Sequence, residues 1–265
     1  MIDRRLSRRQ SMRVSILVNS GRVALFAVII WGWKVGTENG TLPEIAFSDP
    51  SAVWDQLREW LVDGETYRNI MVTTYEALVG FVIGSVLAMA VVLSFTLYPL
   101  LGEAVDPVLA LLNAVPRMAM APVFIIWFGL GYTPKIVLVV SVVFFIVFLN
   151  LHHGLAAVDR LALDNLRILG AGPLRMIRAF YVPALLGWLF TSLRTGVGFA
   201  FAAAVVAEYL GSTRGLGYLI SFGLASYSAE EAVAGLIILV VLVLVVDGIL
   251  TMIERHFAHW RLGRD

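Results

Sequence analysis

The chain has 265 residues, of which 59% are hydrophobic and only 15% are charged, and its mean hydropathy is +0.85. Soluble domains are roughly 45–50% apolar and about 25% charged, so this composition indicates an integral membrane protein. The formal net charge of +1 identifies no class of partner, and the absence of cysteine excludes disulfides, thiolate catalysis and cysteine-based metal sites. Because the four histidines are few and scattered, we expect no metal site in this chain.

The N-terminal end is a basic tail followed by a short apolar run. Residues 1–15 carry Arg4, Arg5, Arg8, Arg9 and Arg13, and residues 16–36 are predicted to form the first span. Signal peptides also begin with basic residues before an apolar run. Here no small-residue cleavage site follows and further spans do, so we expect the segment to remain as a membrane helix.

Residues 37–69 are expected to lie outside the membrane. Within them, Trp54, Leu57, Trp60 and Leu61 recur at helical spacing. This spacing predicts a short amphipathic helix on the outer surface of the membrane, with Ser51 or Asp49 as its N-terminal cap.

Five further runs are long and apolar enough for membrane helices, because a span needs about 20 mostly apolar residues. They are Glu76–Glu103, Asp106–Gly131, Ile136–Leu151, Ala179–Ala207 and Ala232–Ile253. With six spans, both termini and residues 159–183 fall on one side of the membrane. Lys and Arg favour cytoplasmic segments, so the basic tails predict that this side is the cytoplasm. The predicted fold is therefore all-α, a single polytopic domain over residues 1–265 with its core over residues 70–260.

The polar segment 159–183 is predicted to be a cytoplasmic helix–turn–helix. Ala162, Leu166 and Leu169 form one apolar stripe, and Asp164 and Arg167 are three residues apart, so they can pair on the polar face. Gly170 is suited to the left-handed position that ends a helix. Pro173, which follows, suits the first turn of a second helix over Leu174–Tyr181. A basic amphipathic helix lying on lipid is the alternative interpretation.

Three elements in this order resemble the permeases of bacterial ABC importers. The pattern E-A-A-x-x-x-G followed by I-x-L-P maps onto Asp164, Asn165, Leu166 and Gly170, and onto the final Val182–Pro183. VPRMAMAPVFIIWFGLG, from Val115, and LRTGVGFAFAAAVVAEYLGSTRGLGYLI, from Leu193, are similar to elements of the sulfonate, taurine, nitrate and bicarbonate permeases. The chain departs from the family pattern where the glutamate is Asp164 and the two alanines are Asn165 and Leu166.

The resemblance implies a type I ABC importer permease fold in the bacterial inner membrane. Partners would be a cytoplasmic ATPase dimer, a second permease copy in a homodimer, and an extracytoplasmic solute-binding protein that delivers a small anion. The chain has no G-x-x-x-x-G-K-[ST] motif. We therefore expect no enzymatic activity and no cofactor here, with ATP and Mg²⁺ bound by the ATPase. The coupling helix that docks on the ATPase would comprise Asp164, Asn165, Leu166, Arg167, Gly170 and Ala171.

Charged residues within the spans are candidates for the translocation pathway, because charge in a membrane is costly. We select Arg117 with its neighbour Met118, and Arg194 and Glu208. Arg117 lies between two prolines, so it either faces an aqueous path or braces backbone carbonyls that the prolines leave without donors. Glu208 precedes a glycine-rich segment and is interpreted as holding that loop, whereas Asp247 is expected to pair with a helix end or an arginine.

The span that contains Arg194 is rich in small residues, which favours a helix in the core or facing a second copy. A secondary transporter that does not use ATP is the alternative function. Such transporters tend to carry internal repeats, and the two halves of this chain show no self-similarity. A membrane-embedded enzyme would need clustered titratable groups in its spans, and the spans hold only isolated charges.

Overall fold

The computed structural model describes residues 8–62, 64–158 and 160–258, and the regular secondary structure of this part of the chain consists of helices alone. Helices are the expected form, because a backbone in lipid has no water to satisfy its polar groups. The elements are α1 (Arg8–Glu38), α2 (Glu44–Phe47), α3 (Pro50–Val62), α4 (Gly64–Leu97), α5 (Pro99–Asn113), η1 (Arg117–Met120), α6 (Ala121–Phe128), α7 (Tyr132–Ala156), α8 (Arg160–Ile168), α9 (Pro173–Met176), η2 (Ile177–Tyr181), α10 (Val182–Gly211), α11 (Leu216–Ala225) and α12 (Ala229–Ala258).

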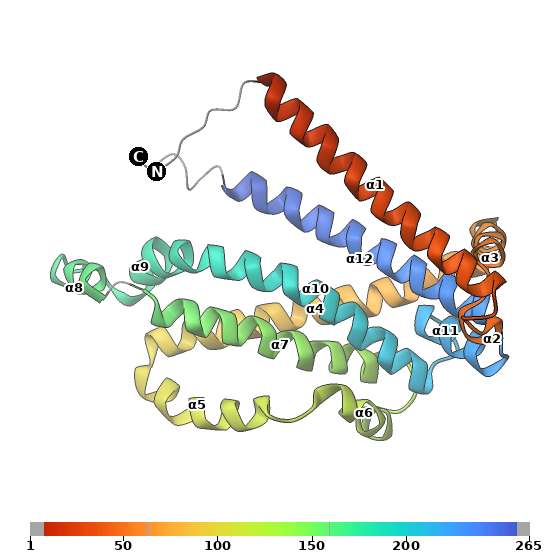
Figure 1. Cartoon of the computed structure of the whole chain (residues 1–265). Helices are drawn as coiled ribbons and strands as arrows, with labels where there is room; N and C mark the ends of the chain where they lie inside the picture. Colours follow the sequence, from red (N-terminus) through yellow and green to blue (C-terminus); the bar gives the residue numbers. More distant parts are fainter. Residues whose placement is uncertain (1–7, 63, 159, 259–265) are drawn as a thin grey trace.

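The core lies between α4, α7 and α10, which run side by side through the bundle (Figure 1). Glycines let α4 approach α7 closely: a Cβ atom added at Gly80 would lie 2.5 Å from the Cβ atom of Val139. On α10, Gly196 and Ala200 are buried, whereas Gly198 and Ala202 are exposed. Some of the predicted small residues of this helix therefore face the core, where they allow close helix packing, and others face outward.

Four helices in the described residues are long and apolar enough to cross a membrane, and α5 with η1 and α6 makes a fifth, bent candidate. The all-α polytopic prediction is confirmed. The predicted span Asp106–Gly131, which Pro116, Arg117 and Pro122 interrupt in the sequence, is present as a bent passage that begins earlier than predicted, at Pro99, and turns by 78° near Pro116. Proline lacks the amide hydrogen that would continue the α-helix, so the break falls at this residue.

Two predicted span boundaries are also wrong. The sequence places a span between Glu76 and Glu103, but α4 already begins at Gly64 and ends at Leu97, just before Pro99. Glu76 is inside the helix and fully buried. Likewise α7 begins at Tyr132 and includes a buried Lys135. These charges do not mark the membrane edge, because each has a partner inside the bundle.

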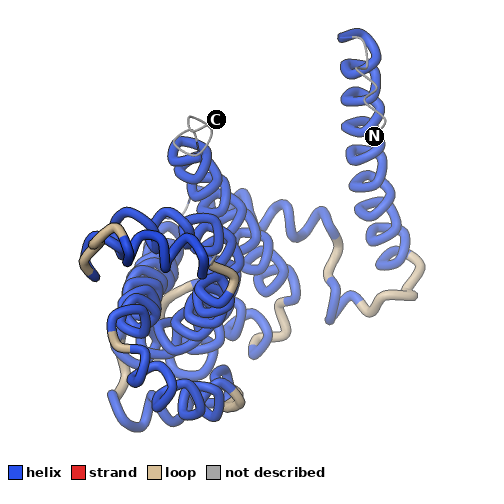
Figure 2. The backbone as a smooth tube through the Cα atoms, turned by 90° about the vertical axis from the view of Figure 1, so that its left-hand side faces the viewer, coloured by secondary structure: helices blue, strands red, loops and turns tan. Residues whose placement is uncertain are grey.

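The predicted first span, 16–36, lies within α1, which is one continuous helix. This helix is not among the apolar spans found in the described residues, and it stands apart from the bundle (Figures 1 and 2). Its link to the rest includes a hydrogen bond from Trp33 Nε1 to the carbonyl oxygen of Ser48, 3.2 Å long. Residues 1–7 of the predicted basic tail lie outside the described residues.

The amphipathic helix predicted around Trp54 is confirmed as α3. Its first turn is capped by Asp49, whose Oδ1 accepts a 2.7 Å hydrogen bond from the backbone N–H of Ser51. The hydroxyl and the N–H of Ser51 together hold the pKa of the Asp49 carboxyl below its ordinary value. Val53 is buried, whereas its neighbour Trp54 is exposed.

Candidate functional site

The predicted helix–turn–helix is present as α8 and α9, and it projects from one end of the bundle (Figure 1). After α8, Gly170 has φ +76°, and the N–H of Ala171 donates to the carbonyl oxygen of Leu166 at 3.0 Å. This bond from the second residue beyond the helix defines a Schellman ending. The left-handed Gly170 is therefore confirmed, and Pro173 begins the second helix as predicted.

The second helix, predicted over Leu174–Tyr181, leads directly into the next span. It passes through the π-helical turn η2 directly into α10, so that Pro173–Gly211 forms one 39-residue helix. Pro183 has no amide hydrogen to donate to the preceding turn, and a π-turn before it lets the chain continue without that bond.

The α8 segment is anchored by few contacts. Leu163 packs with Met176 and Tyr181 in a small buried cluster. In contrast, Leu161, Ile168, Leu169 and Leu174 are each at least 70% exposed. Asn165 is exposed and Leu166 is half-buried. The side chains of Asp164 and Arg167 lie outside the described residues, as does Asp159, so the predicted Asp164–Arg167 pair stays a prediction.

Arg117 lies at the break between α5 and α6. Its Nη2 donates to the carbonyl oxygen of Leu112 at 3.1 Å and to Asn113 Oδ1 at 3.0 Å. In a regular helix the Leu112 carbonyl would accept the amide hydrogen of residue 116, which is proline. The guanidinium also covers the ring of Phe145, 3.9 Å from its centroid. These contacts favour the bracing interpretation, whereas the pathway role of Arg117 and of the half-buried Met118 stays a prediction.

Arg194 on α10 is tied to α12. Its Nη2 contacts Glu254 Oε2 at 2.7 Å and Thr251 Oγ1 at 3.0 Å, and its Nε lies 3.7 Å from Asp247 Oδ1. The expected pairing of Asp247 with an arginine is confirmed. Arg194 is 48% exposed, so it joins two helices at the surface of the bundle, and a role in the pathway stays a prediction.

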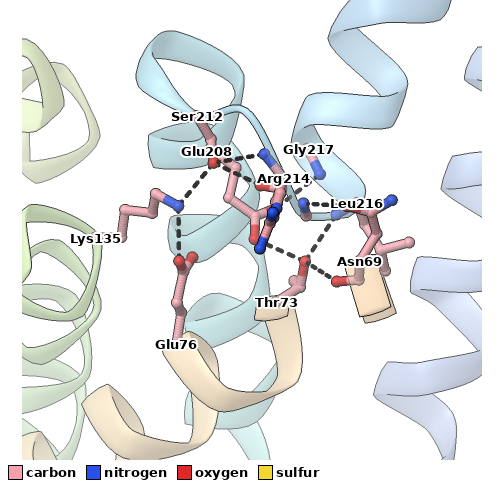
Figure 3. Close-up of polar contacts among 10 residues, drawn as sticks. Asn69, Thr73, Glu76, Lys135, Glu208, Ser212, Arg214, Leu216 and Gly217 are labelled. Atoms are coloured by element: carbon pink, nitrogen blue, oxygen red, sulfur yellow. Dashed lines mark hydrogen bonds and ion pairs between the residues drawn. The ribbon is translucent and has the colours of Figure 1, made fainter. Parts of the chain in front are cut away.

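A buried polar cluster lies beside the loop between α10 and α11 (Figure 3). This loop is at the end of the bundle opposite α8 (Figure 1). We call the buried group the polar cluster, and its members are Asn69, Thr73, Glu76, Lys135, Glu208 and Ser212. Lys135 Nζ contacts Glu76 Oε1 at 2.7 Å and Ser212 Oγ at 2.8 Å. The lysine therefore joins α4, α7 and the end of α10.

Glu208 holds the glycine-rich loop that follows α10, as interpreted from the sequence. Its Oε2 accepts the N–H of Gly217 at 2.7 Å, and its Oε1 accepts the Thr73 hydroxyl at 2.7 Å. Asn69 Oδ1 accepts the N–H of Gly215, and Thr73 Oγ1 accepts the N–H of Leu216, both at 2.8 Å. Three successive backbone donors are thus satisfied by buried side chains, which fixes the loop on α4 (Figure 3).

Sequence reasoning missed most of the polar cluster. In the sequence, Glu76 borders one predicted apolar run and Lys135 directly precedes the run that begins at Ile136. A lone charge beside an apolar run can also belong to a buried ion pair. Glu76 is fully buried and its Oε2 has no hydrogen-bond partner among the described residues. Within the same residues, no group of three or more His, Asp or Glu side chains is arranged to hold a metal ion.

Comparison with known proteins gives one consistent result. Residues 80–259 match the family model described as "Binding-protein-dependent transport system inner membrane component". A probable ABC transporter permease protein of Haemophilus influenzae is 30% identical, over 82% of this chain and 87% of its own. The putative aliphatic sulfonates transport permease SsuC of Bacillus subtilis is 29% identical, over 89% of this chain and 85% of its own.

The taurine transport system permease TauC of Escherichia coli is 23% identical over 97% of this chain and 94% of its own. Among solved structures, an inward-facing MetNI methionine ABC transporter superposes with a TM-score of 0.60 at 19% identity. The match covers 75% of this chain and 97% of that one. At this identity the likeness concerns the fold, which is that of an ABC importer permease.

Proposed function

Because this chain belongs to the family of binding-protein-dependent transport system inner membrane components, the permeases of ABC importers, we propose that it forms the translocation pathway for a small anionic solute. The energy would come from ATP hydrolysed by a separate ATPase subunit, and an extracytoplasmic binding protein would deliver the solute. The observation that carries the proposal is the α8–α9 projection, a folded segment that leaves Ile168, Leu169 and Leu174 each at least 80% exposed.

The coupling proposal assigns α8 to a groove of the ATPase. Ile168, Leu169 and Leu174 are each at least 80% exposed. They would gain about 25 cal/mol per Å² of apolar surface on docking. The fixed turn at Gly170 sets the direction in which this face points. Asp164, Asn165, Leu166, Arg167 and Ala171 complete the proposed contact, with Asp164 in the position of the family's glutamate.

The pathway is proposed to require a second copy of the chain. The space between α4, α7 and α10 is filled by side chains such as Val139, Val143 and Ala203, which are fully buried. A solute therefore has no room between these helices, and the path has to run along an outer face of the bundle. A homodimer that encloses two such faces, with two ATPase subunits, is the simplest arrangement.

The solute is proposed to be a small anion. Support comes from the relatives, two of which are named for the transport of aliphatic sulfonates and taurine. Another relative, from Chloroflexus aurantiacus, is named for riboflavin transport, so the family also includes a larger solute. Arg117, Met118, Arg194 and Glu208 stay the proposed pathway residues.

We place both termini and α8 in the cytoplasm. The beginning of α1, the end of α12 and α8 lie toward the same end of the molecule (Figure 1). Basic residues gather at this end, among them Arg13, Arg175, Arg178 and Arg255, and basic segments favour the cytoplasmic side.

The proposal is tested with the full importer reconstituted in proteoliposomes. Asp164→Lys reverses one charge of the docking segment, so we expect solute-stimulated ATP hydrolysis to fall at least tenfold with normal insertion. Asp55→Lys, an exposed reversal on α3 at the opposite end, is the matched control and should leave hydrolysis unchanged. Normal coupling in Asp164→Lys would refute the assignment of α8. Solute uptake by the permease without its ATPase would instead support the secondary-transporter alternative.

A further inference from the structure

A pocket of about 280 Å³ opens at the end of the bundle that carries the polar cluster. Its walls come from α3, the beginning of α4, the loop after α10, α11 and the beginning of α12. The lining residues are Trp60, Thr66, Arg68, Asn69, Thr213, Arg214, Tyr218, Leu219, Phe222 and Glu231. Pockets for small ligands are commonly about 300 Å³ or larger, so this volume suits a compact organic molecule.

Two arginines supply the positive charge of the pocket. Among the residues that the structure describes, neither Arg68 nor Arg214 lies within ion-pair distance of an acid. Both are exposed, so their guanidinium groups are accessible from solvent. Arginine presents paired donors that match the oxygens of a sulfonate or carboxylate.

Three successive amides of the glycine-rich loop are not available to an anion. Its amides at Gly215, Leu216 and Gly217 are taken by side chains of the polar cluster. Ser212 further fixes the loop, because its hydroxyl donates to the Arg214 carbonyl oxygen and accepts the Arg214 N–H at 3.2 Å. The backbone that carries Arg214 is therefore held in place before any ligand arrives, which reduces the entropy lost on binding.

The other walls restrict the ligand further. Trp60, Tyr218 and Phe222 offer apolar surface, and the last two rings lie 6.0 Å apart. Glu231, in the first turn of α12, adds one negative charge. A second negative charge on the ligand would face this carboxylate, so the pocket favours a monoanion, or a zwitterion whose ammonium group meets Glu231, over an inorganic dianion.

We infer that this pocket is a receiving site for the transported solute, a small organic monoanion or zwitterion with a short apolar part. The inference rests on the proposed function, since it places a solute site on the face opposite the proposed coupling segment. Lys135 contacts Ser212, and Ser212 fixes Arg214, so the pocket is also connected to the helix pair α4–α7. Binding of a solute in the pocket is thereby coupled to the positions of α4 and α7.

The test uses the full-length permease in nanodiscs, without binding protein or ATPase. Butanesulfonate and taurine are titrated by calorimetry, with sulfate as the dianion comparison. We expect saturable binding of at least one organic ligand, at least tenfold weaker binding of sulfate, and at least a tenfold loss of affinity in both Arg68→Gln and Arg214→Gln. Arg58→Gln is the matched control. Arg58 covers the ring of Trp54 on α3 and does not line the pocket. The ligand affinity of Arg58→Gln should therefore equal that of the wild type.

Three results would overturn the inference: no saturable binding at millimolar ligand, equal affinities in the wild type and both variants, or binding of a short-chain phosphatidylglycerol with no binding of either organic ligand. The last result would identify a lipid headgroup site. A failure of the proposed function can be distinguished from a failure of this inference. Normal transport by the full importer with no binding to the permease alone refutes only the pocket. Saturable binding with no solute-stimulated ATP hydrolysis refutes only the coupling to ATP.

Discussion

Lys135→Met is expected to destabilise the permease more than any surface substitution. The lysine and Glu76 side chains are 6% and 0% exposed, and their charged atoms are 2.7 Å apart. Removing one partner of a buried pair strands the other charge and costs about 3–5 kcal/mol. On a scale of 2–4 °C per kcal/mol for a chain of this size, the apparent unfolding temperature should fall by about 6–20 °C. The measurement is thermal unfolding of the purified protein by intrinsic fluorescence.

Two further variants separate the ion pair from a simple change of volume. Lys34→Met removes a pair with Glu38 that is 3.8 Å long and more than half exposed, and such pairs contribute little, so the unfolding temperature should not change measurably. The double variant Lys135→Met with Glu76→Leu removes both charges and should recover most of the loss. A fall of less than 3 °C in Lys135→Met, or a double variant no better than the single one, would refute this reasoning.

Further substitutions test three other parts of the molecule. Gly80→Ala places a methyl group against α7 and should cost about 1–3 kcal/mol by overpacking, whereas Gly198→Ala, which meets nothing within 4 Å, should not lower the unfolding temperature. Arg117→Ala and Arg117→Lys should both lower the unfolding temperature, because Lys lacks the planar fork that meets two acceptors; full rescue by Lys would contradict the bracing role. Gly170→Val should cost about 1 kcal/mol or more, since φ is +76° there, and should reduce solute-stimulated ATP hydrolysis more than protein level. The control Gly172→Val, at negative φ and with open space, should keep both.

Features that depend on neighbouring residues could be predicted from the sequence. The end of α8 at Gly170 follows from the lack of a Cβ atom, and the start of the next helix follows from Pro173. The cap at Asp49 is of the same kind. The long apolar helices follow from the thickness of a bilayer, which sets the length of each run. In each case the physical cause lies within a few residues, so one sequence is enough.

Features that depend on contacts between distant residues could not be predicted. Glu208 was correctly interpreted as holding the loop after α10, but its partner Thr73 is 135 residues away. Glu76 and Lys135 are 59 residues apart, and each alone resembles a residue at the membrane edge. The two prolines around Arg117 predict a break, but the 78° turn also depends on the packing of α5 on α4 and of α6 on α7.

The continuous helix from Pro173 to Gly211 connects the two ends of the permease mechanically. At 1.5 Å per residue its 39 residues are about 58 Å long. One end is joined to the α8 segment, and the other carries Glu208 and the loop that forms a wall of the pocket. A tilt of about 10° around the midpoint would displace each end by about 5 Å, in opposite directions. A small movement imposed on α8 would therefore reach the far face as a displacement larger than a hydrogen bond. A softer point on the way is the π-turn at Ile177–Tyr181, which directly follows α9, so the 30 residues of α10 beyond it can move together.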